Sequence, residues 1–262
     1  MTVAFANDGT LASGAADRSV VIWDLKAEWK LDRIIGTGDS NSPLVDRVNA
    51  VKFSPDGKSL ATGGGEPTRD GEIKLWQVDT GQLIRSFTNV HSDAVFSLDF
   101  SPDGKYLASG AADKFVKVIE LDTGKIVRQF EGHTHHVLGV SWNRNERTLA
   151  SAGADNVVKI WDFVKGEKTK TIAGFDKEVT AISFVGYSDQ ALAASGDAKV
   201  RLVREDASDV RSFSGATDFV ESAVITPDGK IVLAGGQDSI LRVWDGTNGK
   251  LLASFPPPEA RP

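Results

Sequence analysis

Apolar and polar residues alternate with a period of two in short segments along the chain. The pattern is clear in Val51-Lys-Phe53, Val116-Lys-Val118 and Val158-Lys-Ile160. Such alternation is typical of a strand with one face against a core, whereas a helix would repeat near 3.6 residues. Turn dipeptides separate the segments, with Asp-Gly at 8–9, 56–57, 103–104 and 228–229, Thr-Gly at 80–81 and 123–124, and Asn-Gly at 248–249. The pattern therefore predicts short antiparallel strands joined by tight hairpins.

The same unit recurs along the whole chain. One aspartate occupies the same register in each copy, at Asp17, Asp70, Asp113, Asp155, Asp197 and Asp238, with separations of 53, 43, 42, 42 and 41 residues. Extra residues at 36–44 and 63–69 account for the long first interval, so the period is close to 42, as in propeller blades. Each copy is predicted to be a four-stranded sheet with strands a to d. In the fourth copy these strands are expected at 137–142, 148–152, 157–162 and 169–173.

A four-stranded sheet of this size cannot bury both of its faces alone. The copies must therefore stack face to face around an axis, which predicts an all-β propeller of six blades. We expect a single propeller domain over residues 1–255, followed by a Pro-rich tail at 256–262. The blades are expected at about 1–36, 46–88, 93–131, 135–173, 177–214 and 218–255.

Motifs at fixed places in the repeat carry a family resemblance. The third strand ends in Trp23-Asp24, Trp161-Asp162 and Trp244-Asp245, with Trp76-Gln77 as a near match. Gly132-His133 precedes one copy, and Ser-Pro-Asp-Gly occupies 54–57 and 101–104. Over essentially its whole length the sequence resembles the WD-repeat family. The resemblance implies blades stabilised by a hydrogen-bonded tetrad: a His before strand a, a Ser or Thr on strand b, the Asp of the b–c turn and the Trp of strand c.

Only the fourth copy matches this tetrad in full, with His133, Ser151, Asp155 and Trp161. The third copy keeps His91, Ser109 and Asp113 but has Ile119 at the Trp position. The first copy retains Ser13, Asp17 and Trp23, and the second retains Thr62, Asp70 and Trp76. The fifth copy retains only Asp197, with Ala193, Val203 and Phe175 at the Ser, Trp and His positions. The sixth copy retains Asp238 and Trp244, with Ala234 at the Ser position. We expect an incomplete polar network in most blades but an intact fold, because the replacements are small or apolar.

Composition narrows the chemistry that is open to the chain. The 262 residues include no Cys, which excludes disulfides, thiolate metal sites and cysteine nucleophiles. A net charge of −6 gives no reason to expect nucleic acid or an anionic membrane as a partner. The sequence shows neither a membrane-spanning apolar run nor a secretory signal, so we expect a cytoplasmic protein.

Candidate reactive residues all have a simpler structural interpretation. The cluster His133, His135 and His136 could share a metal ion, but one structural histidine and two on an exposed loop is the favoured interpretation. Gly63-Gly-Gly65 is expected to let an inserted loop turn rather than to hold a phosphate. The common hydrolase, phosphate-loop and zinc-protease motifs do not occur, so we expect no enzyme and no cofactor. Basic residues on the third strands, Lys74, Lys117, Lys159 and Arg201, are expected to face solvent.

Function is then expected to depend on the surface. In the WD-repeat family the d–a and b–c loops commonly receive protein partners, and the resemblance carries these contact positions to Arg47, Asn49, Arg69, Ala94, Phe96, His136, Leu138, Glu178, Thr180, Phe219, Glu221 and Gln237. Their mixture of aromatic, Arg and aliphatic groups suits a protein or peptide partner. The alternative is that Phe96, Leu138 and Phe219 only plug the mouth of the central channel.

Three functional hypotheses follow, together with one about the extent of the chain. The leading hypothesis is a non-catalytic interaction scaffold, and the alternative is a propeller module of a larger protein, such as an enzyme with its active site elsewhere. A propeller enzyme in its own right is the third. The first predicted strand begins almost at Met1 and the last ends near Phe255. WD-repeat propellers commonly have seven blades, so we expect the six blades to be the carboxy-terminal part of a longer propeller. A closed ring of six is the alternative.

Overall fold

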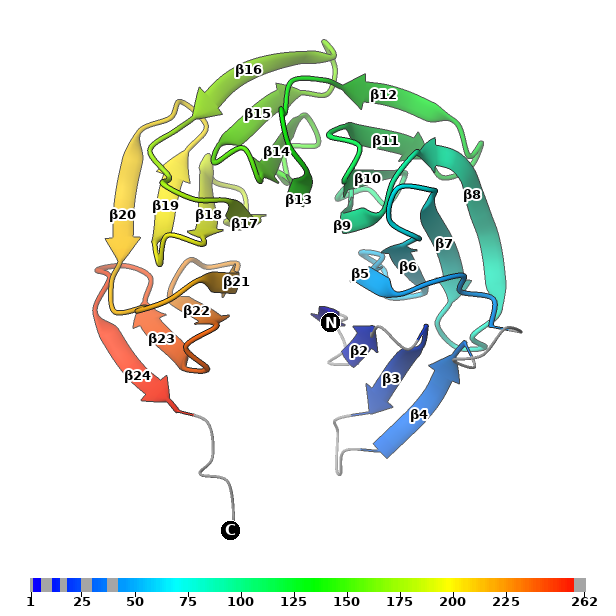
Figure 1. Ribbon diagram of the computed structural model, residues 1–262, viewed down its shortest axis with the longest axis horizontal. Coiled ribbons are helices and arrows are strands. Elements are labelled where there is room, and N and C mark those ends of the chain that lie inside the picture. The colour runs from blue at the N-terminus through cyan, green and yellow to red at the C-terminus, as the bar shows by residue number, and fades with distance from the viewer. Residues whose placement is uncertain (1, 6–10, 15–17, 25–29, 37–41, 257–262) are drawn as a thin grey trace. The chain divides into compact units, whose positions relative to one another are not determined.

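The computed structural model describes residues 2–5, 11–14, 18–24, 30–36 and 42–256 (Figure 1). These residues form 24 strands and no helix. The strands make six four-stranded antiparallel sheets, in each of which strands consecutive in sequence are neighbours. This confirms the predicted all-β class and the six blades. The chain divides into two compact units of three blades each, residues 1–132 and 133–262.

The first unit holds blades one to three. Blade one consists of β1 (Thr2–Phe5), β2 (Leu11–Gly14), β3 (Val20–Asp24) and β4 (Lys30–Ile35). Blade two consists of β5 (Val48–Phe53), β6 (Ser59–Gly64), β7 (Gly71–Gln77) and β8 (Leu83–His91). Blade three consists of β9 (Val95–Phe100), β10 (Tyr106–Ala111), β11 (Val116–Glu120) and β12 (Ile126–Phe130).

The second unit holds blades four to six. Blade four consists of β13 (Val137–Trp142), β14 (Thr148–Gly153), β15 (Val158–Asp162) and β16 (Glu167–Ile172). Blade five consists of β17 (Val179–Phe184), β18 (Gln190–Ser195), β19 (Val200–Arg204) and β20 (Asp209–Phe213). Blade six consists of β21 (Val220–Ile225), β22 (Ile231–Gly236), β23 (Leu241–Asp245) and β24 (Leu251–Phe255).

The Asp-Gly turns between strands a and b form because the aspartate caps the turn. In blade three, Asp103 Oδ1 accepts hydrogen bonds from Ser101 Oγ at 2.6 Å and from the Lys105 amide at 3.1 Å. Gly104 then adopts a positive φ of 71°, which a residue with a Cβ would reach only with strain. The sequence pattern thus fixes both the place and the geometry of this hairpin.

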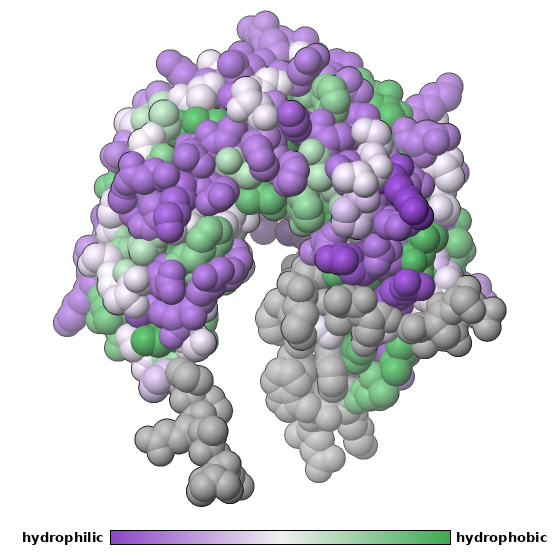
Figure 2. Space-filling model, viewed as in Figure 1, coloured by the Kyte–Doolittle hydropathy of each residue, from purple (hydrophilic) through white to green (hydrophobic). Residues whose placement is uncertain are grey.

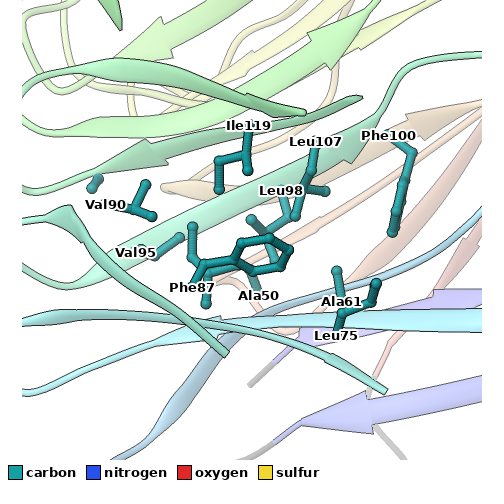
Figure 3. Close-up of a cluster of buried hydrophobic side chains, with 12 residues drawn as sticks. Ala50, Ala61, Leu75, Phe87, Val90, Val95, Leu98, Phe100, Leu107 and Ile119 are labelled. Atoms are coloured by element: carbon teal, nitrogen blue, oxygen red, sulfur yellow. The ribbon is translucent and has the colours of Figure 1, made fainter. Parts of the chain in front are cut away.

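Apolar side chains between neighbouring blades form the core of each unit. Between blades two and three, Phe87 from strand d lies beside Ala50 and Val95 from the two strands a (Figure 3). A similar cluster joins blades four and five, and includes Phe175, Val179 and Ile182. Within each unit the blades therefore bury one another's faces, which a single sheet cannot do.

Strand boundaries in blade four differ from the prediction by one or two residues. The fourth strand begins at Glu167 and ends at Ile172, earlier than the predicted 169–173. A register shift between Ile160 and Trp161 lets Trp161 pair with Lys168 and Asp162 with Glu167, so the pairing reaches one residue further, to Glu167. Such bulges cannot be predicted from alternation alone, because the residue pattern on either side is unchanged.

Within the part of the chain that the structure describes, no helix is long and apolar enough to cross a membrane.

Candidate functional site

The d–a loops and the b–c hairpins lie at the same end of every blade, because successive strands of a sheet run in opposite directions. We use the name loop face for this end of the blades in each unit. It carries the predicted partner-binding residues and also the histidines and aspartates of the tetrads.

In blade four a chain of hydrogen bonds runs from strand c to the loop face. Trp161 Nε1 donates to Ser151 Oγ at 2.8 Å, and Ser151 Oγ lies 2.7 Å from His133 Nε2. His133 Nδ1 lies 2.8 Å from Asp155 Oδ1, and Asp155 Oδ2 accepts the Thr134 amide at 2.9 Å. Because an ionised carboxylate can only accept, the Nδ1 of the histidine donates and its Nε2 accepts from the serine hydroxyl. The four side chains therefore tie strands b and c, the hairpin between them and the entering d–a loop together.

The close approach of this network depends on a glycine at the end of strand b. A Cβ at position 153 would collide with the carboxylate of Asp155 and the imidazole of His133. Burial lowers the pKa of His133, and this effect exceeds the opposing influence of the hydrogen bond that His133 donates to Asp155. The imidazole is therefore neutral at physiological pH, as the hydrogen-bond pattern requires.

Ser151, His133 and Asp155 have the connectivity of a Ser-His-Asp catalytic triad. Their surroundings differ from those of a nucleophile, because Ser151 is fully buried and its Oγ also accepts the Trp161 indole. The His133 side chain is 1% exposed. An acyl substrate could reach this hydroxyl only if the blade opened, so the arrangement stabilises the blade and does not present a nucleophile.

Blade three contains the same arrangement without the tryptophan. His91 Nδ1 lies 2.9 Å from Asp113 Oδ2, and His91 Nε2 lies 2.8 Å from Ser109 Oγ. The buried Ile119 occupies the Trp position, and Ser109 Oγ lies 3.3 Å from the Lys117 carbonyl oxygen. Burial also lowers the pKa of His91.

Blade two departs from the expected register at its b–c hairpin. Trp76 Nε1 donates to Thr62 Oγ1 at 2.9 Å, and the buried Leu44 stands where blades three and four have the histidine. Asp70, however, is exposed, because strand c begins directly after it at Gly71 and the inserted residues widen the hairpin. Glu72 takes its place and accepts the Val45 amide at 3.3 Å. In blade one, Asp17 and the side chain of Trp23 lie outside the described residues.

Arginines stabilise blades five and six, where histidine is missing. In blade five the guanidinium of Arg201 lies 4.6 Å from the centre of the Phe175 ring, and Phe175 stands at the His position. In blade six Arg242 Nη1 donates to Asp238 Oδ2 at 2.6 Å. Ala234 stands at the Ser position and has no hydroxyl, and the indole of Trp244 donates to the Ser214 carbonyl at 2.9 Å instead.

The prediction that the basic residues of strand c face solvent is wrong. Lys74 and Lys159 are 7% and 6% exposed. Lys74 pairs with Glu72, Lys117 Nζ donates to the Val90 carbonyl at 2.6 Å, and Arg201 Nη1 donates to the Gly174 carbonyl at 3.1 Å. Their aliphatic stems are buried while their charged ends reach the carbonyls and carboxylates beside the d–a loops. By binding these carbonyls and carboxylates, the basic residues stabilise the d–a loops of the loop face. The alternating pattern did not indicate this role.

The predicted partner-binding residues differ widely in exposure. The side chains of Arg47 and Arg69 are 54% and 73% exposed, and Glu221 and Gln237 are also exposed. The half-buried positions are Asn49, Phe96, His136, Leu138, Glu178, Thr180 and Phe219. Ala94 is buried at 2% exposure, so its side chain offers a partner almost no surface.

Three of the half-buried residues contact the neighbouring blade. Asn49 Nδ2 donates to the Val95 carbonyl at 3.2 Å, and Thr180 Oγ1 donates to the Val220 carbonyl at 2.8 Å. The ring of Phe219 lies over Gly196, where a Cβ would collide with it. The two hydrogen bonds join adjacent strands a within each unit, and the Phe219 contact joins the d–a loop before blade six to the b–c hairpin of blade five. They leave the charged side chains as the most accessible part of the loop face.

Hydrophilic residues dominate the face of the molecule drawn in Figure 2, with small hydrophobic patches between them. His135 is exposed, and its ring centre lies 4.4 Å from that of His136. Among the residues that the structure describes, no group of three or more His, Asp or Glu is placed to hold a metal ion.

Comparison with known proteins agrees with the repeat pattern. The family model described as WD domain, G-beta repeat matches residues 1–24, 39–77, 81–120, 124–162 and 207–245. Residues 163–206 lie outside these matches, and they include most of blade five, the blade that retains only Asp197 of the tetrad.

Three curated proteins illustrate the relatives. The Oryza sativa subsp. japonica protein named chromatin assembly factor 1 subunit FAS2 homolog is 30% identical over 141 residues, 51% of this chain and 27% of that protein. The Drosophila melanogaster WD repeat-containing protein 26 homolog is 35% identical over 95 residues, 35% of this chain and 14% of that protein. The Mus musculus F-box-like/WD repeat-containing protein TBL1X is 28% identical over 142 residues, 52% of this chain and 26% of that protein. The matches therefore span less than a third of each relative.

Proposed function

Because the chain belongs to the WD-repeat family, we propose that it is a non-catalytic scaffold that binds protein or peptide partners on its loop face. Fold alone does not name a function, so the proposal depends on the residues at that face. The observation that carries it is a loop backbone held by hydrogen bonds, with exposed side chains on it.

Aspartates of the b–c hairpins hold the d–a loops in place. In blades three to six each accepts an amide hydrogen bond from the start of the neighbouring d–a loop, in the pairs Ser92 N–Asp113, Thr134 N–Asp155, Asp176 N–Asp197 and Thr217 N–Asp238 at 2.9–3.2 Å. Ordering these loops in advance lowers the entropic cost of binding, so a partner does not have to order them.

The accessible residues above this backbone have the chemistry of a protein-binding surface. Arg47 and Arg69 are exposed guanidiniums in the first unit, and the half-buried Phe219 and the exposed Glu221 lie two residues apart in the second. Arginine and aromatic side chains commonly dominate binding energy at protein interfaces. The net charge of −6 favours a protein partner over nucleic acid. One relative is named as a subunit of an assembly factor, which agrees with this role.

The buried tetrads support the non-catalytic part of the proposal. Ser151 and Ser109 are 0% exposed, so neither hydroxyl is available to a substrate. The second candidate function, a propeller module within a larger protein, is favoured by the relatives, of which the matched regions form 14–27%. In that case too the loop face would bind, either to a separate partner or to another part of the same protein.

A capture experiment with paired variants tests the proposal. The triple variant Arg47→Glu, Phe96→Ala and Phe219→Ala should lose the partners that the native chain retains, as identified by mass spectrometry. A control variant, Arg144→Glu with Tyr187→Ala, changes exposed residues at the opposite end of the blades and should retain them. Equal capture by both variants, with both folded by circular dichroism, would exclude the loop face as the binding surface.

A further inference from the structure

A groove lies between blades two and three at the end of the sheets opposite the loop face. Its volume is about 430 Å³, within the roughly 300–1,000 Å³ of ligand pockets. The buried Leu75 and Phe100 and the partly buried Leu121 form an apolar floor. The two a–b turns form the sides, and each turn places one aspartate, Asp56 or Asp103, at the groove.

The two carboxylates are held ionised by their own turns. The hydrogen bond from Ser54 Oγ to Asp56 Oδ1, 2.6 Å long, lowers the pKa of Asp56, and the Lys58 amide adds to this effect. Burial raises the pKa of Asp103, but hydrogen bonds from Ser101 and Lys105 outweigh burial and lower it overall. Both groups are therefore negative at neutral pH.

Lys105 neutralises part of this charge, because its Nζ lies 3.0 Å from Asp103 Oδ2. The lysine side chain is 69% exposed, so the pair is a surface salt bridge that contributes little free energy. A cation brought by a partner can replace the lysine at small cost.

The second unit has a groove at the equivalent place, between blades five and six, with a volume of about 360 Å³. The two grooves share one architectural feature: Arg85 Nη1 donates to the Leu121 carbonyl in the first, and Arg211 Nη1 donates to the Gly246 carbonyl in the second, both at 2.8 Å. They differ in charge. Asp228 stands where the first groove has Asp103, but the exposed Tyr187 stands where it has Asp56. Of these two grooves, the one in the first unit therefore has two turn aspartates and the one in the second unit has one.

We propose that the groove between blades two and three binds a peptide segment of a partner protein in which a basic side chain adjoins an apolar one. The apolar side chain covers Leu75 and Phe100, and the basic side chain lies between Asp56 and Asp103. Charge complementarity selects this occupant, since an acidic segment would meet two carboxylates. The groove lies at the other end of the blades from the loop face, so a scaffold could hold a second partner there independently of the first.

Fluorescence anisotropy with labelled model peptides tests this proposal on the full chain. The probe contains three arginine–leucine repeats, and the comparison peptides contain glutamate–leucine or arginine–serine repeats. The arginine–leucine peptide should bind saturably, the other two should bind about tenfold more weakly or worse, and added salt should weaken binding. Asp56→Lys and Asp103→Lys should each weaken binding of the probe by about tenfold.

Asp228→Lys is the matched control, because Asp228 caps its turn through Thr226 and Lys230 as Asp103 does through Ser101 and Lys105. It removes the same kind of turn hydrogen bonds and should leave the affinity unchanged. Loss of binding in Asp228→Lys equal to that in Asp103→Lys would overturn the proposal. So would equal affinity for the glutamate–leucine peptide, or the absence of saturable binding up to about 1 mM. The loop-face variants should bind the probe normally, so the two proposals can fail separately.

Discussion

Trp161 and Ser151, both buried, are joined by a hydrogen bond of 2.8 Å from the indole nitrogen to the serine oxygen. The same oxygen lies 2.7 Å from His133, so one hydroxyl links the core of blade four to the loop face. The serine hydroxyl donates its proton to His133 and accepts the indole N–H of Trp161. Without this hydroxyl, two buried polar groups would lack a hydrogen-bond partner, which costs free energy.

Replacement of Trp161 should separate packing from hydrogen bonding in this network. Trp161→Ala should lower the free energy of unfolding by about 3–5 kcal/mol, because it removes a large buried side chain. Trp161→Phe keeps most of the apolar contact and should cost about 1–2 kcal/mol, mainly for the lost hydrogen bond. The exposed His135 provides the control, and His135→Ala should change stability by less than about 0.5 kcal/mol. Urea unfolding followed by tryptophan fluorescence and circular dichroism measures all three, and equal midpoints for Trp161→Ala and His135→Ala would contradict the structural role.

Two glycines on the b strands should respond to alanine in opposite directions. At Gly153 a Cβ would collide with Asp155 and His133, so Gly153→Ala should destabilise by about 1–3 kcal/mol. At Gly235 the added Cβ would meet nothing within 4 Å, and the backbone there does not need a positive φ. Gly235→Ala should therefore be neutral or stabilise by up to about 1 kcal/mol, through the reduced entropy of the unfolded chain. Thermal melts of the two variants give the comparison, and a destabilised Gly235→Ala would contradict it.

The blades could be predicted from sequence because several local signals agree. Period-two alternation, Asp-Gly turns and an aspartate recurring about every 42 residues each indicate the same unit. The aspartate recurs because it caps the b–c turn: Asp113 Oδ1 accepts the Phe115 amide at 3.2 Å while Lys114 between them has a φ of 75°. A local hydrogen bond of this kind leaves a visible pattern in the sequence.

The environment of the strand-c basic residues could not be predicted in the same way. Alternation shows which residues share a face of a sheet, but not what covers that face. Blades two and five have neighbours on both faces within their own units, so Lys74 and Arg201 are covered although they alternate with core residues. Likewise Glu72 replaces Asp70 only because the inserted residues extend strand c, and the lengths of such insertions do not reveal where pairing resumes.

Acid should destabilise the chain before its carboxylates titrate. Burial lowers the pKa of both His91 and His133 below the usual 6.5, so the folded chain keeps them neutral while the unfolded chain binds protons. Stability is then full above the unfolded pKa of about 6.5 and falls as the pH drops below it, by up to about 1.4 kcal/mol per pH unit for each histidine. Unfolding midpoints measured from pH 8 to about pH 5 should show this slope.

The corresponding variant is His133→Gln, in which one of the two buried imidazoles is absent. Its absolute stability should be lower, but its loss of stability between pH 7 and about pH 5 should be smaller than in the native chain. His135→Ala should keep the native slope. An unchanged slope in His133→Gln would show that the imidazole does not stay neutral in the folded blade.

The ion pair Arg242–Asp238 is predicted to stabilise blade six, which has no histidine in its d–a loop. The two side chains are 7% and 10% exposed, and the bond from Arg242 Nη1 to Asp238 Oδ2 is 2.6 Å long. Burial alone would raise the pKa of Asp238, but hydrogen bonds from Arg242 and from the Ile240 and Thr217 amides lower it to about 2. Arg242→Met should therefore leave a poorly compensated carboxylate and cost about 3 kcal/mol at pH 7. Arg242→Lys should cost less, because lysine occupies this register in blades two, three and four.

The double variant Arg242→Met with Asp238→Asn distinguishes an unpaired charge from simple loss of packing. An amide in place of the carboxylate needs no counter-charge, so the double variant should recover part of the stability that Arg242→Met loses. In the native chain the contribution of Asp238 is present above pH 4 and decreases as the pH falls toward 2, since the folded pKa lies below the unfolded value of 3.8. That acid loss should shrink in Arg242→Met, whose carboxylate has a higher pKa. A double variant less stable than Arg242→Met alone would show that the arginine acts through its aliphatic stem and not through its charge.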